Sequence, residues 1–275
     1  MFKADPMARI LLATDFSDNA VHAAEYAVGL FGPKGNTYTL LHTYVDLSLA
    51  DPMVPSMAAE LMKASEDGLR DHVDRFVRRT GAEGVRQEVR YGPLPAVIND
   101  IAREGNNDLV VIGNAGKTGS FFFGSNTISV LKHSHLPVLA VPAGAKVKTV
   151  ERILLADDRG DILPGDLDML RRIAQLSAAE VLVGHVEMPV NEGTSLESEG
   201  VYGPALAGVA HSYHHARGAD VVDGLDRLAR RKHVDLIAVL HRHIGLLAGM
   251  FHPSTAQELA QRIELPLLVL EQNRN

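Results

Sequence analysis

Short runs of consecutive apolar residues alternate along this chain with longer stretches in which apolar residues recur every three or four positions. RILLA at 9–13 and DLVVI at 108–112 show the first pattern, and Leu69, Val73 and Phe76 show the second. Continuous apolar runs are typical of strands buried on both faces, and the longer period is typical of helices packed on one side. The pattern predicts an α/β, doubly wound fold with a parallel sheet between two layers of helices.

The predicted elements follow one another regularly. In the first half we expect strands at 9–14, 37–43, 85–91, 108–113 and 137–142, and helices at 18–31, 55–80, 93–104 and 125–134. In the second half we expect strands at 152–157, 180–186, 211–217, 235–241 and 266–270, and helices at 163–178, 220–232 and 252–263. The segment 188–208 is rich in Gly, Glu, Ser and Pro, and we expect a loop there with at most a short helix.

The chain repeats itself. ARILLATDFS at 8–17 recurs 143 residues later as ERILLADDRG, and His42 matches His185 at the same offset. DLVVI at 108–112 recurs as DLIAV only 127 residues later, so the second copy is shorter by about 16 residues between its second and fourth strands. We therefore expect two domains, at 1–145 and 150–275, built from one unit.

Composition and charge exclude several classes of protein. The net charge of −7, with no basic run, argues against a nucleic-acid partner. The absence of cysteine excludes a disulfide framework, a thiol nucleophile and a cysteine-based zinc site. No apolar run reaches the roughly 18 residues of a membrane span, and the amino-terminal stretch lacks a signal-peptide pattern. We expect a cytoplasmic protein without a membrane partner.

A glycine-rich loop carries the strongest chemical signal. GNAGKTGSFFFGSN at 113–126 lies between a predicted strand and a predicted helix. Glycines let backbone N–H groups approach an anion, and the start of a helix offers free N–H donors and the positive end of its dipole. The loop predicts nucleotide binding at the carboxyl edge of the sheet, where doubly wound folds hold ligands. The alternative is that the glycines only allow a tight turn from strand to helix.

These residues resemble the universal stress protein family, and the duplication resembles a tandem member with two UspA-type domains in one chain. ATP-binding members of that family carry G-x2-G-x9-G-[ST] after the fourth strand and an aspartate just after the first. Gly113, Gly116, Gly124 and Ser125 match the glycine motif in order, and Asp15 stands in the place of the aspartate. The resemblance covers nearly the whole chain.

The resemblance implies a site, a fold and a mode of action. It places Ala13, Asp15, Thr43 and Ile112 around an adenosine, and Gly113, Gly116, Gly124, Ser125 and Asn126 around the phosphates and ribose of ATP, with Mg²⁺ as a companion ion. It implies two flavodoxin-like or Rossmann-like sheets of order 3-2-1-4-5, paired by their fifth strands about a pseudo-twofold axis. It also implies action through conformation and protein partners, with further homodimerisation of the chain as an option.

Alternatives remain open at several residues. The loop has seven residues between Gly116 and Gly124, two fewer than the family pattern, so it either closes over a triphosphate or rejects it. Asp15 either faces a ligand or metal or helps to cap the following helix. Lys117 either meets a phosphate or is simply solvated. The other functions considered are a module that binds no nucleotide and, less favoured, an enzyme, because no catalytic motif is present beyond what weak ATP hydrolysis would need.

The second copy has lost the glycine motif. Leu240 and His243 stand where the first copy has Gly113 and Gly116, so we expect a degenerate domain that does not bind ATP in the same way.

Histidines are frequent in this copy instead. Asp157, His185, His241 and His243 are expected at one sheet edge, where they form either a zinc site or an ordinary polar crevice. The other histidines of this copy, His211, His214 and His215, are expected at the surface or at the edge of the sheet.

Overall fold

Ten strands join into one sheet in the computed structural model of the chain, which describes residues 7–46, 57–113, 125–187, 198–241, 258–259 and 264–272. The first half contributes β1 (Arg9–Ala13), α1 (Asp18–Phe31), β2 (Thr37–Tyr44), α2 (Ala58–Thr80), β3 (Val85–Tyr91), α3 (Leu94–Glu104), β4 (Leu109–Gly113), α4 (Ser125–His133) and β5 (Val138–Val141). The second half contributes β6 (Arg152–Asp157), α5 (Asp168–Ser177), β7 (Glu180–Glu187), α6 (Ser198–Ala205), β8 (His211–Arg217), α7 (Val221–Lys232), β9 (Leu236–His241) and β10 (Leu267–Glu271).

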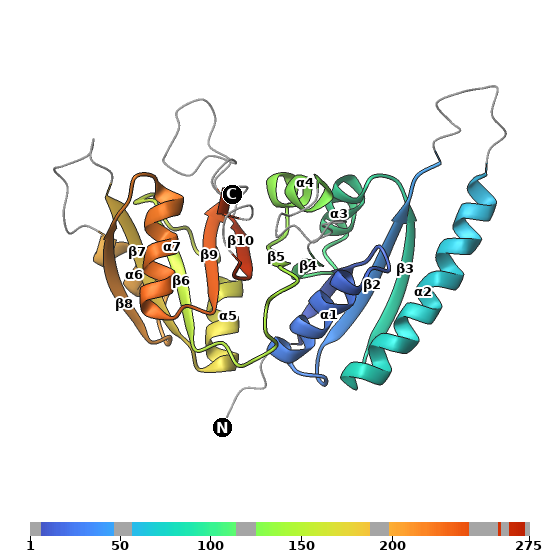
Figure 1. Cartoon of the computed structure of the whole chain (residues 1–275), viewed down its shortest axis with the longest axis horizontal. Coiled ribbons are helices and arrows are strands. Elements are labelled where there is room, and N and C mark those ends of the chain that lie inside the picture. Colours follow the sequence, from blue (N-terminus) through green and yellow to red (C-terminus); the bar gives the residue numbers. More distant parts are fainter. Residues whose placement is uncertain are drawn as a thin grey trace.

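The two halves have the same strand order. The sheet runs β3-β2-β1-β4-β5-β10-β9-β6-β7-β8, and the pairs within each half are parallel (Figure 1). The halves meet where β5 and β10 pair antiparallel, with Ala140 opposite Leu267 and Val138 opposite Val269. The predicted order 3-2-1-4-5 and the predicted pairing of the fifth strands are therefore confirmed.

Helices cover both faces of the sheet and divide the core into two layers. Because side chains alternate along a strand, Ile10 and Leu12 of β1 face one layer while Leu11 faces the other. The first layer is formed with α1, α2, α5 and α6, and the second with α3, α4 and α7. Burial on both faces explains why the strands are almost continuously apolar. Among the described residues, no helix is both long and apolar enough to cross a membrane.

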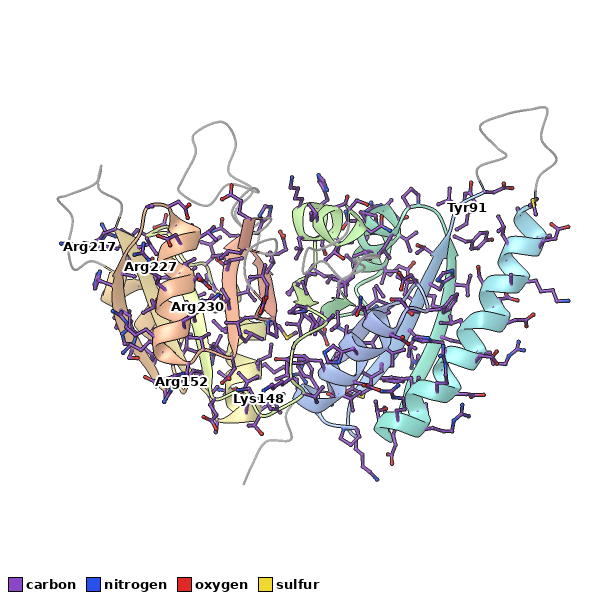
Figure 2. All side chains as sticks on the ribbon, in the orientation of Figure 1. Tyr91, Lys148, Arg152, Arg217, Arg227 and Arg230 are labelled. Atoms are coloured by element: carbon purple, nitrogen blue, oxygen red, sulfur yellow. The ribbon has the colours of Figure 1, made fainter. Side chains whose placement is uncertain are left out.

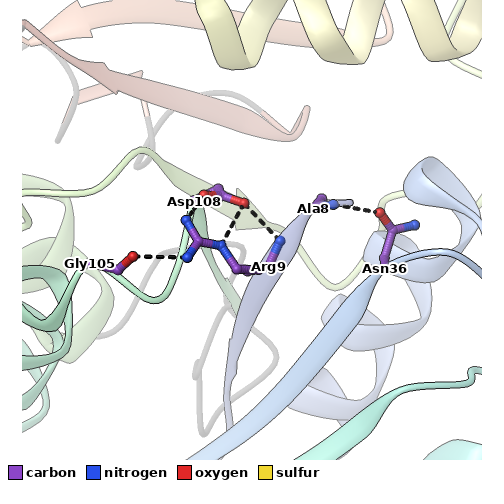
Figure 3. Close-up of polar contacts among 5 residues, drawn as sticks. All are labelled: Ala8, Arg9, Asn36, Gly105 and Asp108. Carbon is purple, nitrogen blue, oxygen red and sulfur yellow. Dashed lines mark hydrogen bonds and ion pairs between the residues drawn. The ribbon is translucent and has the colours of Figure 1, made fainter. Parts of the chain in front are cut away.

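An arginine–aspartate clamp holds the amino ends of the central strands of the first half. Asp108, just before β4, accepts hydrogen bonds from the backbone N–H of Arg9 at 2.9 Å and from its guanidinium at 2.6 Å (Figure 3). The same guanidinium donates to the carbonyl of Gly105 at 2.9 Å. The clamp fixes the start of β1 to the start of β4.

The second half repeats this clamp with an added lysine. Asp235 accepts from the backbone N–H groups of Glu151 and Arg152 at 2.8 and 3.1 Å, and Arg152 donates to the carbonyl of Lys232. Lys148, in the segment that joins the halves, forms an ion pair with Asp235; Lys148 and Arg152 are labelled in Figure 2. Burial favours the neutral form of Asp235, but the hydrogen bonds from Lys148 and the two amides outweigh it and lower its pKa below 3.8.

Two helix predictions differ from the structure. The helix predicted at 163–178 begins only at Asp168, because Gly165 takes a positive φ of 91° and Asp166 accepts a hydrogen bond from the N–H of Leu163, which forms a turn first. The helix predicted at 252–263 lies almost wholly outside the described residues. The short helix allowed within 188–208 is confirmed as α6, and the domain limits 1–145 and 150–275 stay predictions.

Replacing Asp235 by alanine should destabilise the protein by about 1–3 kcal/mol at pH 7, because two backbone donors and Lys148 lose their acceptor. A lowered carboxyl pKa contributes stability above the unfolded value of 3.8 that is lost as pH falls through the folded value. Urea unfolding should therefore show a smaller difference between wild type and variant at pH 3 than at pH 7. Lys148→Met, which removes a largely exposed partner, should cost less than about 1 kcal/mol. A difference that does not change with pH would contradict this account.

Candidate functional site

The turn after β1 is held by its own side chains. The Thr14 hydroxyl accepts from the N–H of Phe16 at 3.0 Å, and the Asp15 carboxylate accepts from the N–H of Ser17 at 3.0 Å. Ser17 is the N-cap of α1 and accepts from the N–H of Ala20. Phe16 takes a φ of 67°, which is uncommon for a side chain of its size. Asp15 thus takes part in the start of α1, as one of its two interpretations expected, and it remains exposed.

A pocket opens at the carboxyl ends of β1, β2 and β4. Its volume is about 530 Å³ including the open mouth, within the range of small-molecule sites. It lies beside β1 and β4, where the strand order of a doubly wound sheet reverses. The residues that line it are Ala13, Thr14, Asp15, Ser17, Ala20, His42, Thr43, Leu94, Ile112, Gly113, Asn126 and Thr127.

Most of the expected ligand residues meet in this pocket. Ala13, Asp15, Thr43, Ile112, Gly113 and Asn126 all line it. Ser125 is the first residue of α4, next to the lining residue Asn126. Gly116, Lys117 and Gly124 lie outside the described residues. The start of α4 is tied to β4 because Thr127 donates to the carbonyl of Gly113 at 3.2 Å.

Gly113 also has a packing reason to be glycine. A Cβ atom there would lie 2.5 Å from the carbonyl oxygen of Asn19 and 2.8 Å from its carbonyl carbon, both in the backbone at the start of α1. The glycine therefore allows β4 and α1 to approach closely whether or not a ligand binds.

Two side chains that the sequence analysis did not assign to the site lie behind the turn. His72 of α2 forms a hydrogen bond with the Thr14 hydroxyl at 3.1 Å, and the ring of Phe16 stacks on that of His42 with centroids 4.2 Å apart. His42 also donates from Nδ1 to the carbonyl of Thr14 at 2.9 Å. Helical spacing places His72 on the apolar face with Leu69 and Phe76, a sign of burial that does not reveal its partner.

The second half repeats the turn with different residues. Asp157 accepts from the N–H of Arg159 at 2.7 Å, and Asp158 accepts from the N–H of Gly160 at 3.0 Å. Arg159 has a φ of 58°, and His185 donates to the carbonyl of Asp157 at 3.2 Å. Asp157 therefore corresponds to Thr14, and Asp158 is the counterpart of Asp15. This corrects the view of Asp157 as the retained acid.

The repeated turn is closed by α6. The hydroxyl of Tyr202 donates to Asp157 at 3.0 Å, and both residues are buried. Leu240, at the position of Gly113, is buried as well. The described residues therefore fill, in this half, the space beside the turn that stays open in the first half.

The histidines of this half have mixed outcomes. Within the described part of the chain, no group of three or more His, Asp or Glu side chains is placed to hold a metal ion, so Asp157, His185 and His241 do not form a zinc site by themselves. His243 lies outside the described residues. The expected edge position of the remaining three is confirmed, because His211, His214 and His215 all lie on the outermost strand β8.

Fold and pocket together define a doubly wound α/β protein with a ligand site at the switch point of its first half. The sequence pattern described as "Universal stress protein family" matches residues 7–142. Universal stress protein G of Shigella flexneri is 32% identical over 149 residues, which cover 51% of this chain and 99% of that protein. The chain belongs to the universal stress protein family.

Two further similarities agree with this. A universal stress protein of Methanocaldococcus jannaschii is 28% identical over 138 residues, covering 48% of this chain and 81% of that protein. The crystal structure of a universal stress protein from Archaeoglobus fulgidus superposes with a TM-score of 0.74 and 19% identity, covering 96% of this chain and 98% of that one. The second likeness concerns the fold of the whole chain, both halves included.

Gly113→Ala should destabilise the protein by about 1–3 kcal/mol, because the new methyl group meets backbone atoms that cannot turn away. Gly144→Ala is the matched control, since nothing lies within 4 Å of its Cβ position. Thermal unfolding of the two variants without any ligand tests this. Equal melting temperatures would show that β4 and α1 are not packed as described.

Tyr202→Phe should cost about 1–2 kcal/mol of stability, because the buried carboxylate of Asp157 loses a hydrogen-bond donor while the ring is kept. Tyr91→Phe is the control, because Tyr91 is exposed at the end of β3 (Figure 2). Chemical denaturation gives both free energies of unfolding. A loss no larger than that of the control would remove Tyr202 as the residue that closes this half.

Proposed function

We propose that the protein binds ATP, or a related adenine nucleotide, in the pocket of its first half and acts through conformation and protein partners. The observation that carries the proposal is the convergence of Ala13, Asp15, Thr43, Ile112, Gly113 and Asn126 on one pocket. Parts of the chain more than a hundred residues apart supply them, and the family resemblance names the same residues for the nucleotide.

The chemistry of the pocket suits a nucleoside. The apolar side chains of Ala13, Leu94 and Ile112 can flank a flat base, and Asp15 and Thr43 offer polar atoms to a ribose. The start of α4 borders the same pocket and offers helix N–H donors and a positive dipole end to phosphates. Mg²⁺ would accompany the phosphates, and the oxygens of Asp15 suit that ion.

One nucleotide per chain follows from the difference between the halves. In the second half the buried Tyr202 and Leu240 occupy the corresponding region. The second half then serves as a structural and regulatory partner. Because the sequence lacks a catalytic motif, hydrolysis of the nucleotide would be weak at most.

The competing candidate is an interaction module of the same fold that binds no nucleotide. The packing reason for Gly113 favours it, since that glycine is needed even in an empty pocket.

Isothermal titration with ATP in the presence of Mg²⁺, together with chromatography of nucleotides released from freshly purified protein, decides between the two. We expect a stoichiometry near one. Asp15→Ala should weaken binding at least about tenfold, because it removes a polar contact and a turn hydrogen bond. Asp158→Ala, the counterpart in the second half, should leave the affinity unchanged.

Two sites per chain would contradict the assignment to the first half. The absence of binding at millimolar ATP, AMP and cyclic AMP would favour the interaction module.

A further inference from the structure

The proton on the ring of His72 is placed by its neighbours. Nδ1 of His72 lies 3.3 Å from a guanidinium nitrogen of Arg75, which can only donate, so Nδ1 carries the lone pair. The proton is therefore on Nε2, which donates to the Thr14 hydroxyl at 3.1 Å. His72 is 1% exposed, so water does not replace either contact. The ring is neutral and has one orientation.

Thr14 passes this contact on to the turn. Its hydroxyl oxygen also accepts from the N–H of Phe16, the residue with positive φ. The ring of Phe16 lies against α2, where a Cβ at Gly68 would come within 3.2 Å of it. The turn that carries Asp15 to the pocket therefore depends on α2 at two places, the His72–Thr14 hydrogen bond and the Phe16–Gly68 contact.

The second half supports the same logic. There Asp157 takes the place of Thr14, and its outside donor is the hydroxyl of Tyr202 from α6. Both halves thus supply one donor from the helix region after the second strand to the residue that holds the left-handed turn. Only the first half uses a group that titrates near neutral pH for this contact.

We propose that His72 is a positioning residue for the nucleotide site: its neutral ring, oriented by Arg75, holds Thr14 and with it the turn that presents Asp15 to the pocket. This rests on the proposed nucleotide binding. His72 does not line the pocket and acts through Thr14.

Acid should weaken the site through this residue. Protonation would put an N–H on Nδ1 opposite the guanidinium of Arg75, so the present contact would be lost. Burial, then Arg75, lower the pKa of His72 below 6.5; the carboxylate of Asp15 opposes the shift and His42 adds to it. These groups come from α2, the turn after β1, and β2. Nucleotide affinity is therefore constant above pH 6.5 and falls as the pH drops through the folded pKa of His72.

Three variants test the proposal by titration with ATP at pH 7.5 and at lower pH. His72→Phe removes the donor and should weaken binding roughly tenfold at pH 7.5. His72→Gln can donate its amide N–H to Thr14 and accept from Arg75 with its carbonyl, so it should bind like wild type at pH 7.5 and lose the decline in acid. Arg75→Met should move the decline to higher pH, and Arg78→Met, exposed one turn further on, should not.

Hydrogen exchange of the Phe16 amide in nucleotide-free protein gives a readout that needs no ligand. Exchange should be faster in His72→Phe and unchanged in His72→Gln and Arg78→Met. If wild type binds no nucleotide, the proposed function fails while this exchange result still decides the role of His72 in the turn. Unchanged affinity and exchange in His72→Phe, or equal weakening by Phe and Gln, would overturn the proposal.

Discussion

The antiparallel pairing of β5 with β10 is the constraint on which the rest of the structure depends. Both strands are apolar and buried, and as free edges each would expose unpaired backbone groups beside apolar side chains. Pairing them removes both edges at once and makes the hydrophobic layers continuous across the two halves. The outer edges are then β3 and β8, whose side chains are largely polar.

This arrangement also explains where chemistry can occur. Strands that are buried on both faces leave no room for polar groups along their length, so these collect at the strand ends. The amino ends hold the clamps of Asp108 and Asp235, which fasten the central strands. The carboxyl ends hold the turns after β1 and β6, and only the first of these stands beside an open pocket.

The two copies diverge mainly in the segment between their second and third strands. In the first half α2 reaches the turn through His72, and in the second half the shorter α6 reaches it through Tyr202. Histidine contacts an uncharged hydroxyl, whereas tyrosine contacts a buried carboxylate. A deletion between two strands has thus been accommodated without changing the backbone of the turn, because Phe16 and Arg159 keep the same left-handed conformation.

Sequence alone determined the strands, the repeat, the strand order implied by the family resemblance and most residues of the pocket. It could do so because burial on both faces leaves a continuous apolar run for each strand, and because the carboxyl ends of parallel strands must share one edge. It could not identify His72 or Tyr202 as partners of the turns, nor Asp157 as the counterpart of Thr14. Those contacts join helices to strand ends tens of residues away, and the late start of α5 depends on a turn formed by Gly165 and Asp166. Only the tertiary structure decides such pairings, since periodicity shows that a side chain is buried and not which atom it meets.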